Sequence, residues 1–322
     1  MNATVTRLVV FAPNWLGDAV MSLPAIEDIR RGATDAALTI AARSAIAPLF
    51  TTVAGIDSVV VPGDLRAQKF DAAVLLPNSF HAALVARRAD IPERWGYRTD
   101  WRGWLLTRAI AAPSGVHQVE YYQTLARELG FSGAPRAPRI ALSPDVSERG
   151  NRALTNAGWD GRTPIVAFAA GSAYGGAKRW PPEYFAELAN TLAGDGVQVV
   201  MVGSQADRAV GCEIERGLQR RDATLSVFGT DLPTLAAVLA RCRVIVSNDS
   251  GAMHLGAALG VRVAAVFGPT DERLTRPSGD DHAVLTHPAW CRPCLLRECP
   301  LDHQCMRGVG VQRVADATRQ ML

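Results

Sequence analysis

The chain has 322 residues, with 34 Lys and Arg against 31 Asp and Glu, and 48% of its residues are hydrophobic. This length exceeds the usual size of one hydrophobic core, so we expect two domains, and the composition excludes a disordered chain. A net charge of +3 is too small to indicate nucleic acid as a partner. No apolar run has bilayer-spanning length and no signal-peptide pattern opens the chain, so we expect a cytoplasmic protein.

Up to Gly130, short apolar runs alternate with amphipathic segments. The apolar runs predict buried strands at Arg7–Ala12, Leu38–Ala42 and Asp71–Pro77. Apolar residues at helical spacing predict helices at Asp18–Arg31, Ser79–Ala89 and His117–Gly130, the last of which ends at a glycine, as helices often do. This alternation indicates a first α/β domain.

Ser132–Pro144 is rich in proline and has no hydrophobic period, which makes it the best linker candidate in the chain. We therefore expect domains at 1–143 and 144–322. The alternation restarts after the linker, with near-continuous apolar runs at Pro164–Gly171, Val197–Gly203, Arg243–Asp249 and Val261–Pro269. Helical patterns separate or follow them, at Pro182–Gly196, Gln205–Leu218, Leu232–Cys242, Gly251–Gly260 and Gly310–Leu322.

Near-continuous apolar runs are typical of strands that are buried on both faces of a parallel sheet. Two such blocks predict two doubly wound, Rossmann-like α/β domains that face each other across a cleft. In sheets of this kind, ligands bind at the carboxyl ends of the strands, where helix N-termini direct backbone N–H groups at anions. The strand ends are therefore where candidate site residues are expected.

The first such strand end is the loop Ala169–Pro181, "AAGSAYGGAKRWP". Its glycines, including Gly171, and the small residue Ser172 would let the backbone approach a pyrophosphate, with Lys178 as a compact countercharge. The loop matches neither the P-loop nor the dinucleotide fingerprint. A solvated basic surface loop is an equally good interpretation of the local pattern.

The second is "SNDSGAMHLGAALG", Ser247–Gly260. Asp249 and Ser250 end a predicted strand, Gly251 opens a helix, and His254 lies in its first turn. These groups can converge on a phosphate or on a developing leaving-group charge. Helix capping by Asp or Ser and a core role for His254 are the structural alternatives.

Asp18, in "NWLGDAV", lies where the first predicted strand turns into a helix. Aspartate is a preferred N-cap residue, so capping is one interpretation. The other is a general base that faces a substrate hydroxyl. Asp18 lies at a strand end of the first block, which is where such a base would be needed opposite the phosphate loops of the second block.

A basic and aromatic stretch follows in the first block. From Arg87 to Arg108, six arginines stand against three acidic residues, together with Trp95, Tyr97, Trp101 and Trp104. This composition can receive an anionic, amphipathic acceptor. A solvated helix face combined with ordinary aromatic core residues is the alternative.

Four cysteines gather near the C-terminus: Cys291, Cys294, Cys299 and Cys305. Four soft ligands that include a C-x-x-C pair can close a tetrahedral zinc site. Reduced structural cysteines are the alternative, because the spacing departs from the common zinc pattern. The chain has no Asp-x-Asp pair of the kind that metal-dependent sugar transferases use, so a catalytic metal is not expected.

The chain resembles the bacterial ADP-heptose:lipopolysaccharide heptosyltransferases of glycosyltransferase family 9, and most closely their heptosyltransferase II branch. The resemblance rests on an ordered set of strings along nearly the whole chain: "APNWLGDAVMSLPAI", "LLPNSFHAAL", "GYR", "HQVEYY", "GSAYGGAKRWP", "NDSGAMHLGAALG", "VFGPTDE" and "CRPCLLRECPLDHQC". It implies the GT-B fold, in which an N-terminal domain binds the acceptor and a C-terminal domain binds the nucleotide sugar. It also implies transfer of heptose from ADP-heptose with inversion, without a metal and without a cofactor.

The resemblance also implies roles for individual residues. Asp18 matches the family's base for the acceptor hydroxyl, and Lys178 matches its donor-phosphate lysine. The element that holds the nucleotide diphosphate matches Asp249, Ser250, Gly251 and His254. Asp207 is the candidate for the ribose contact, and Gly171 and Ser172 complete the donor set.

On the acceptor side, Asn78, Ser79 and Arg98 are the candidates. The implied acceptor is an anionic lipid A–Kdo–heptose molecule, which would bring the enzyme to the inner face of the cytoplasmic membrane. Two alternatives remain: a GT-B transferase with another nucleotide-diphospho-sugar or another glycan acceptor, and a non-catalytic nucleotide or metal-thiolate binding module.

Overall fold

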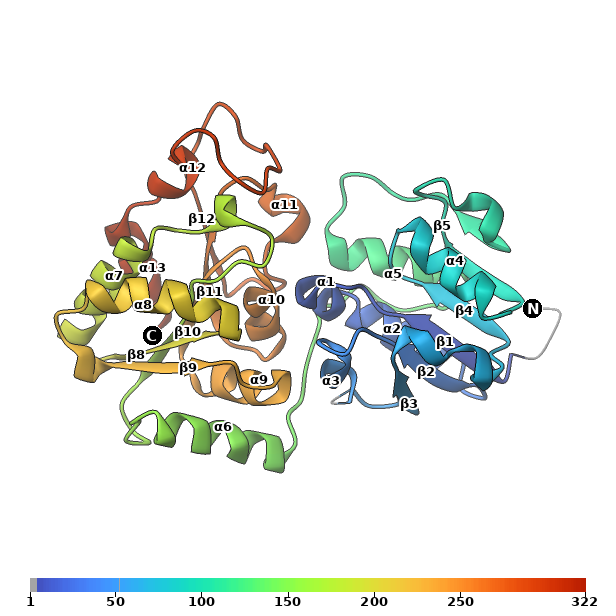
Figure 1. Cartoon of the computed structure of the whole chain (residues 1–322), viewed down its shortest axis with the longest axis horizontal. Coiled ribbons are helices and arrows are strands. Elements are labelled where there is room, and N and C mark those ends of the chain that lie inside the picture. The colour runs from blue at the N-terminus through green and yellow to red at the C-terminus, as the bar shows by residue number, and fades with distance from the viewer. Residues whose placement is uncertain (1–4, 52) are drawn as a thin grey trace. The chain divides into compact units, whose positions relative to one another are not determined.

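A computed structural model describes residues 5–51 and 53–322. The chain forms two compact units whose boundary lies between Ala141 and Leu142. We call the N-terminal one unit 1 and the C-terminal one unit 2. Each is a doubly wound α/β unit with a six-stranded parallel sheet, as the alternation in the sequence predicts (Figure 1).

The sheet of unit 1 has the strand order β3-β2-β1-β4-β5-β6. Its strands are β1 (Arg7–Phe11), β2 (Ala37–Ala41), β3 (Ser58–Val60), β4 (Ala72–Leu75), β5 (Glu93–Tyr97) and β6 (Arg108–Ile110). Leu8 of β1 lies opposite Leu38 of β2 on one side and opposite Ala72 of β4 on the other. The chain therefore winds outward from β1, returns to β4 and winds outward again, so the switch point of the sheet lies between β1 and β4.

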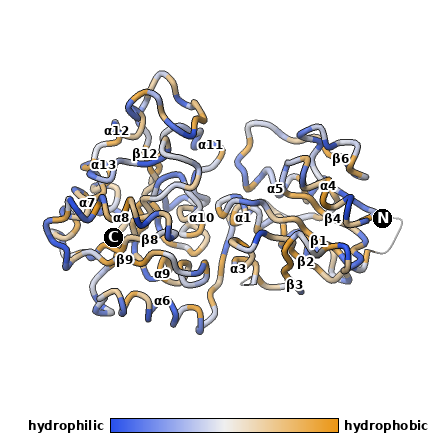
Figure 2. The backbone as a smooth tube through the Cα atoms, viewed as in Figure 1, coloured by the Kyte–Doolittle hydropathy of each residue, from blue (hydrophilic) through white to orange (hydrophobic). Residues whose placement is uncertain are grey.

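The central strands of unit 1 are hydrophobic because both of their faces are covered. Val9, Val10, Ala73 and Val74 are fully buried, and Figure 2 shows the strands as hydrophobic stretches of the backbone. The helices are α1 (Leu16–Met21), α2 (Leu23–Gly32), α3 (Ala47–Phe50), α4 (Phe80–Arg88) and α5 (Gln118–Glu128). Helix α2 packs against α1 and α5, and α4 packs on β4 and β5.

The predicted helix Asp18–Arg31 is two helices. Ser22 ends α1 and begins α2, and Pro24 follows in the first turn of α2. Proline lacks the N–H that a continuous helix would need and is favoured in a first turn, which explains the break. The strands β3, β5 and β6 were missed because they are short or carry charged residues.

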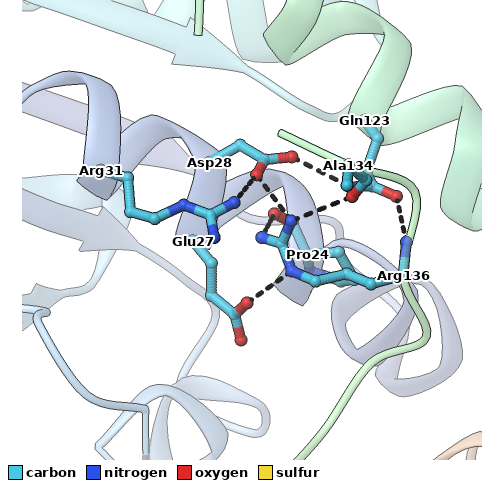
Figure 3. Close-up of polar contacts among 7 residues, drawn as sticks. All are labelled: Pro24, Glu27, Asp28, Arg31, Gln123, Ala134 and Arg136. Atoms are coloured by element: carbon cyan, nitrogen blue, oxygen red, sulfur yellow. Dashed lines mark hydrogen bonds and ion pairs between the residues drawn. The ribbon is translucent and has the colours of Figure 1, made fainter. Parts of the chain in front are cut away.

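The first residues of the proline-rich segment are bound to unit 1. Figure 3 shows Arg136 reaching α2, where its guanidinium binds Glu27 (Nε to Oε2, 2.9 Å), Asp28 (Nη1 to Oδ1, 2.7 Å) and the carbonyl oxygen of Pro24 (2.6 Å). Gln123 of α5 donates to the other oxygen of Asp28 at 2.9 Å. This cluster holds the start of the linker against two helices.

The sheet of unit 2 has the order β12-β11-β10-β7-β8-β9. Its strands are β7 (Ile165–Ala169), β8 (Gln198–Gly203), β9 (Thr224–Phe228), β10 (Val244–Asn248), β11 (Arg262–Phe267) and β12 (Ala283–Thr286). The four predicted strands are β7, β8, β10 and β11. The outer strands β9 and β12 are half-exposed and were not predicted. The switch point lies between β7 and β10.

The longer helices of unit 2 are α6 (Pro144–Asn156), α7 (Pro182–Gly194), α8 (Arg208–Arg216), α9 (Leu232–Arg241), α10 (Gly251–Ala258) and α13 (Val311–Met321). The single-turn helices are α11 (Glu272–Thr275) and α12 (Gln304–Arg307). Contacts join α7 with α8 and α13, and α9 with α6 and α10, which gives two helical layers on the sheet (Figure 1). No helix within the described ranges is long and apolar enough to cross a membrane.

Candidate functional site

The switch point of unit 2 holds a buried ion pair. Lys178 comes from the loop after β7, and Asp249 comes from the end of β10. The Lys178 Nζ atom lies 2.6 Å from Asp249 Oδ2, and the two side chains are 12% and 6% exposed. Thr270, from the loop after β11, donates its hydroxyl to the same carboxylate oxygen at 2.7 Å. An ammonium group carries three N–H donors, so Lys178 can bind a phosphate oxygen while it stays paired.

The ion pair refines the predicted role of Asp249. A carboxylate repels a phosphate, so direct contact between Asp249 and a nucleotide diphosphate would be unfavourable. The hydrogen-bond geometry instead makes Asp249 the group that holds Lys178 in place. Removing one partner of a buried pair of this kind typically costs about 3–5 kcal/mol.

The loop after β7 contains a buried hydroxyl group, that of Ser172. The Ser172 hydroxyl is buried and has no partner among the described residues. Asn248, fully buried at the end of β10, holds both ends of this loop, because it accepts from the Trp180 N–H at 2.9 Å and donates to the Ala170 carbonyl at 2.7 Å. Buried polar groups without partners are rare in proteins, so the Ser172 hydroxyl is a candidate ligand contact.

The cysteine-containing segment fixes the same loop from the other side. The Leu295 carbonyl accepts from the Tyr174 hydroxyl (2.6 Å), and the Arg297 carbonyl accepts from the Ala177 N–H (2.9 Å). The Glu298 carboxylate accepts from the Gly176 N–H at 3.0 Å. We call 295–298 the clamp. It sets the backbone just before Lys178.

Helix α10 begins at Gly251, as the sequence predicts, with Ser250 as its N-cap residue. The Ser250 side chain makes no capping hydrogen bond and lies 3.1 Å from the Ser247 hydroxyl instead. The first-turn N–H groups of α10 are therefore not capped by Ser250 and point from the end of β10, as an anion site requires. His254 is buried within α10.

Gly256 of α10 lies against Ile245 of β10. A Cβ atom on Gly256 would lie 2.1 Å from Ile245 Cδ1, so this glycine permits close packing of α10 on β10. Gly256 therefore serves the packing of the core.

Asp207 lies beside the donor loop at the end of β8. A Cβ atom on Gly171 would lie 2.1 Å from Asp207 Oδ1, so the two residues are in direct contact. Asp207 Oδ2 accepts from the Ser204 N–H and hydroxyl and forms a capping box. The oxygen Oδ1 faces Gly171. An acidic residue after the second strand is where doubly wound sheets bind a ribose.

In unit 1, Asp18 follows β1, on one side of the switch point. Asp18 is the third residue of α1 and the N-cap residue is Trp15, so the N-cap interpretation of Asp18 is wrong. The Tyr122 hydroxyl donates to Asp18 Oδ1 at 3.3 Å. Burial raises the pKa of Tyr122 well above its usual range, and the Asp18 charge adds to this effect, so Tyr122 keeps its proton and orients the carboxylate.

The acceptor candidates follow the next two strands. Asn78 follows β4, and its amide donates to the Tyr121 hydroxyl at 2.9 Å. Ser79 is the N-cap residue of α4 and accepts from the Ala82 N–H, which gives it a structural role. Arg98 follows β5 and is exposed. Adjacent tyrosines of α5 thus bind Asn78 and Asp18 on the two sides of one switch point.

The basic and aromatic stretch divides into core and surface residues. Trp95 and Tyr97 are buried in β5, whereas Trp101 and Trp104 are 93% and 73% exposed. Arg102 is fully buried and donates to the carbonyl oxygens of Tyr97, Pro77 and Ser79. Burial lowers the pKa of Arg102 to about 10. Arg87 and Arg88 lie exposed in the last turn of α4, as the helix-face interpretation expects. The rest of the stretch contains β5 and β6, and its arginines divide between core and surface.

The structure gives no support for a zinc site. All six cysteines are free thiols. Across 5–51 and 53–322, no three His, Cys, Asp or Glu side chains come together as metal ligands would. Burial raises the pKa of the Cys305 thiol, and the nearby Cys291, Cys299 and Cys294 add to this effect.

Several residues of the site were missed from the sequence. Asn248 and Thr270 adjoin predicted strand ends, and polar residues at those ends are a usable signal. Tyr122 contacts Asp18, and the clamp contacts the Lys178 loop. In both cases the two partners lie far apart in the chain, so no local sequence pattern reveals the contact.

Known proteins match the chain over most of its length. The family described as glycosyltransferase family 9 (heptosyltransferase) matches residues 62–304. Lipopolysaccharide heptosyltransferase 2 of Escherichia coli K12 is 31% identical, and that of Salmonella typhimurium LT2 is 30% identical, each with 87% of both chains covered. The structure of E. coli ADP-heptose lps heptosyltransferase II superposes with a TM-score of 0.85 at 28% identity, covering 98% of both chains.

The two six-stranded parallel sheets and the likeness to heptosyltransferase structures confirm the predicted GT-B fold class. The match to the family covers well over half of the chain, including the loops that carry Lys178 and Asp249. The chain is a glycosyltransferase and belongs to glycosyltransferase family 9.

Proposed function

We propose that this protein transfers heptose from ADP-heptose to the inner core of a lipopolysaccharide acceptor. The observation that carries the proposal is the switch point of unit 2, where the largely buried Lys178 and the Ser172 hydroxyl, which has no partner among the described residues, follow β7, and the first turn of α10 follows the neighbouring β10. Relatives named lipopolysaccharide heptosyltransferase 2 support the choice of donor and acceptor. On this proposal unit 2 binds the donor and unit 1 binds the acceptor.

The proposed reaction inverts the anomeric carbon and needs no metal. The acceptor oxygen forms the new bond to this carbon, and its proton passes to Asp18. The bond between the carbon and the β-phosphate oxygen breaks, and ADP leaves with the electron pair. Lys178 and the N–H groups of α10 meet the charge that grows on the departing phosphate, which is the largest contribution that such a site can make.

Asp18 suits the role of base because it is half-buried at the switch point and Tyr122 orients it. The proposed acceptor contacts are Asn78 and Arg98, which follow β4, the neighbour of β1, and β5, the next strand in the sheet. An acceptor with a lipid part would hold the enzyme at the inner face of the cytoplasmic membrane while it is bound.

The central test is Asp18→Asn, which keeps the shape of the side chain and removes the base. We expect ADP affinity to stay unchanged and the transfer rate to fall by about 10²–10⁴-fold, because a positioned base contributes about that much. Glu120→Gln is the matched control, since Glu120 is an exposed acid in the first turn of α5. Transfer by Asp18→Asn at a rate near that of the wild type would remove Asp18 from the chemistry.

The donor and acceptor are tested separately. Calorimetric titration with ADP, UDP and GDP should show the tightest binding for ADP, and tighter binding of UDP would overturn the ADP-heptose assignment. Turnover of ADP-heptose against a panel of truncated core acceptors then identifies the acceptor. A wild-type protein that binds ADP and transfers no sugar to any of them would favour a binding module.

A further inference from the structure

Two tryptophans of unit 1 project into solvent from one short loop. Trp101 is 93% exposed and Trp104 is 73% exposed. Both lie between β5 and β6, in residues 99–104, which we call the tip. An indole ring is large and mostly apolar, so its exposure to water is unfavourable. Large apolar groups that are exposed side by side mark interaction sites.

Buried polar contacts hold the base of the tip in place. The fully buried Arg102 donates to the carbonyl oxygens of Tyr97 (2.9 Å) and Ser79 (3.3 Å) through its guanidinium. The Arg102 N–H donates to the Thr99 carbonyl oxygen at 3.1 Å. The Thr99 hydroxyl donates to the Asn78 carbonyl oxygen, also at 3.1 Å. The tip is therefore fixed to β5 and to the loop after β4.

The backbone of the tip is held in an unfavourable conformation. Asp100 and Trp101 have φ values of 48° and 56°, in the left-handed region that is costly for residues with a Cβ atom. The Asp100 carboxylate accepts from the N–H of Phe80, the first residue of α4, at 2.6 Å. Strained residues of this kind persist only where the surrounding structure fixes them, and they cluster at functional sites. The fold thus keeps Trp101 exposed at an energetic cost.

An arginine lies against the backbone of the tip. A Cβ atom on Gly103 would lie 3.0 Å from Cγ of Arg98, so the two residues are in contact. Arg98 is exposed. Residues 98–104 contain two arginines and one aspartate, which gives a local net charge of +1. The tip therefore combines two indole rings with a small positive charge, and it would attract an anionic surface.

The apolar area of the tip is small for a protein partner. A tryptophan buries about 150–250 Å², so the two indole rings offer about 300–500 Å² together. A stable protein interface buries about 800 Å² on each partner. Shallow insertion into the headgroup layer of a bilayer has no such requirement, and tryptophan concentrates at that depth because its ring is apolar while its N–H stays hydrogen-bonded.

The position of the tip in unit 1 also favours a bilayer. Through Thr99 the tip contacts Asn78, the acceptor candidate that follows β4. The proposed acceptor carries a lipid part that is embedded in a membrane. The edge of the sheet that holds Asn78 must therefore approach the headgroups of that membrane.

We propose that the tip inserts into the headgroup layer of a phospholipid bilayer, with Trp101 and Trp104 at the interface and Arg98 beside anionic headgroups. The choice of a bilayer rests on the proposed function, because it follows from the lipid part of the acceptor. The contact itself is made by the protein and needs no acceptor.

The experiment measures flotation of the full-length protein with vesicles of phosphatidylethanolamine and phosphatidylglycerol that contain no saccharide. We expect Trp101→Ala and Trp104→Ala each to weaken vesicle binding about tenfold, as loss of a partly buried large apolar side chain does. Trp290→Ala is the matched control, since Trp290 is an 81% exposed tryptophan of unit 2, and its binding should stay within about twofold of the wild type. The free energy of unfolding should change little in all three variants, because the side chains are exposed.

A second arm tests the charge. Arg98→Gln should weaken binding to the vesicles that contain phosphatidylglycerol about fivefold, as removal of one basic residue near an anionic surface does. Binding of the same variant to vesicles of phosphatidylcholine alone should stay within about twofold of the wild type. Equal losses on both kinds of vesicle would overturn the role of Arg98 beside anionic headgroups.

Two other outcomes would overturn the bilayer contact. A wild-type protein that floats with neither kind of vesicle would leave the indole rings to a protein partner. Equal losses in Trp290→Ala and the tip variants would indicate general apolar adhesion. The vesicles contain no acceptor, so absence of heptose transfer would overturn the proposed function alone, and absence of flotation would leave transfer to a lipid-free acceptor unaffected.

Discussion

Asp28 in unit 1 and Asp249 in unit 2 are both buried carboxylates that bind a cation, with side chains 2% and 6% exposed. Asp28 receives Arg136 and Arg31 on one oxygen and Gln123 on the other. A Cβ atom on Gly133 would lie 1.8 Å from Asp28 Oδ1, so the Gly133 backbone packs directly against this carboxylate. The contacts with Arg136 and Gln123 join α2 to the linker and to α5, and the contact with Arg31 lies within α2 (Figure 3).

The surroundings of Asp249 are different. Its partners are Lys178 and Thr270, and beside them the Ser172 hydroxyl is buried with no partner in the described part of the chain. A carboxylate whose hydrogen-bond partners all belong to the fold has a structural role, because fully hydrogen-bonded polar networks rigidify a fold. A buried charge that adjoins open donors at a switch point is suited to a ligand. We therefore assign stability to the first cluster and binding to the second.

The largest effect should come from removing the structural carboxylate. Asp28→Ala leaves Arg136 and Gln123 without their shared partner, and we expect the free energy of unfolding of unit 1 to fall by about 3–5 kcal/mol. Chemical denaturation of the full chain, followed by fluorescence, measures this loss. ADP affinity, measured on the folded fraction, should not change.

The matched control for this variant is Arg66→Ala, which breaks an ion pair with Asp90 in the same unit whose two side chains are 75% and 69% exposed. Exposed pairs contribute about 0–1 kcal/mol, so this variant should unfold almost as the wild type does. A loss below about 1 kcal/mol for Asp28→Ala would contradict its structural assignment.

The second prediction concerns the neighbouring cations Lys178 and Arg179. Lys178→Gln keeps a donor for Asp249 and removes the charge, and we expect ADP affinity to fall by about 10- to 100-fold, as for a charge-assisted hydrogen bond. Arg179 is exposed, so Arg179→Gln should leave ADP affinity within about twofold. Calorimetric titration with ADP measures the affinity of both variants. Equal losses of ADP affinity in Lys178→Gln and Arg179→Gln would mean that the loop attracts ADP only by its net charge.

Lys178 and Arg179 also show which parts of the site can be predicted from the sequence. Strand ends can be predicted from apolar runs, so the regions of Lys178 and Asp249 were identifiable. Which of the two cations points inward depends on Asn248 and the clamp, and the clamp residues lie about 120 positions away in the chain. Contacts between such distant segments follow from tertiary packing, which leaves no local pattern.

Trp95 and Trp101 make the same point for unit 1. Both belong to one aromatic stretch, yet Trp95 lies in a sheet strand and is buried, while Trp101 lies in the following loop and is exposed. The strand was not predicted because "ERWGY" carries two charged residues and a glycine. Pairing with β4 and β6 overrides the weak propensity of this segment.

The smallest predicted effect concerns the clamp, which holds the loop of Lys178 through hydrogen bonds to Tyr174, Gly176 and Ala177. Glu298→Ala removes the acceptor of the Gly176 N–H, and we expect about fivefold weaker ADP binding, as for one hydrogen bond. Glu298→Gln keeps an acceptor oxygen and should restore most of the affinity. Because Glu298 is exposed, the free energy of unfolding should change little in either variant. Equal losses of ADP affinity in Glu298→Ala and Glu298→Gln would show that Glu298 acts through its charge. A loss of stability without a loss of ADP affinity would give the clamp a structural role, like that of the Asp28 cluster.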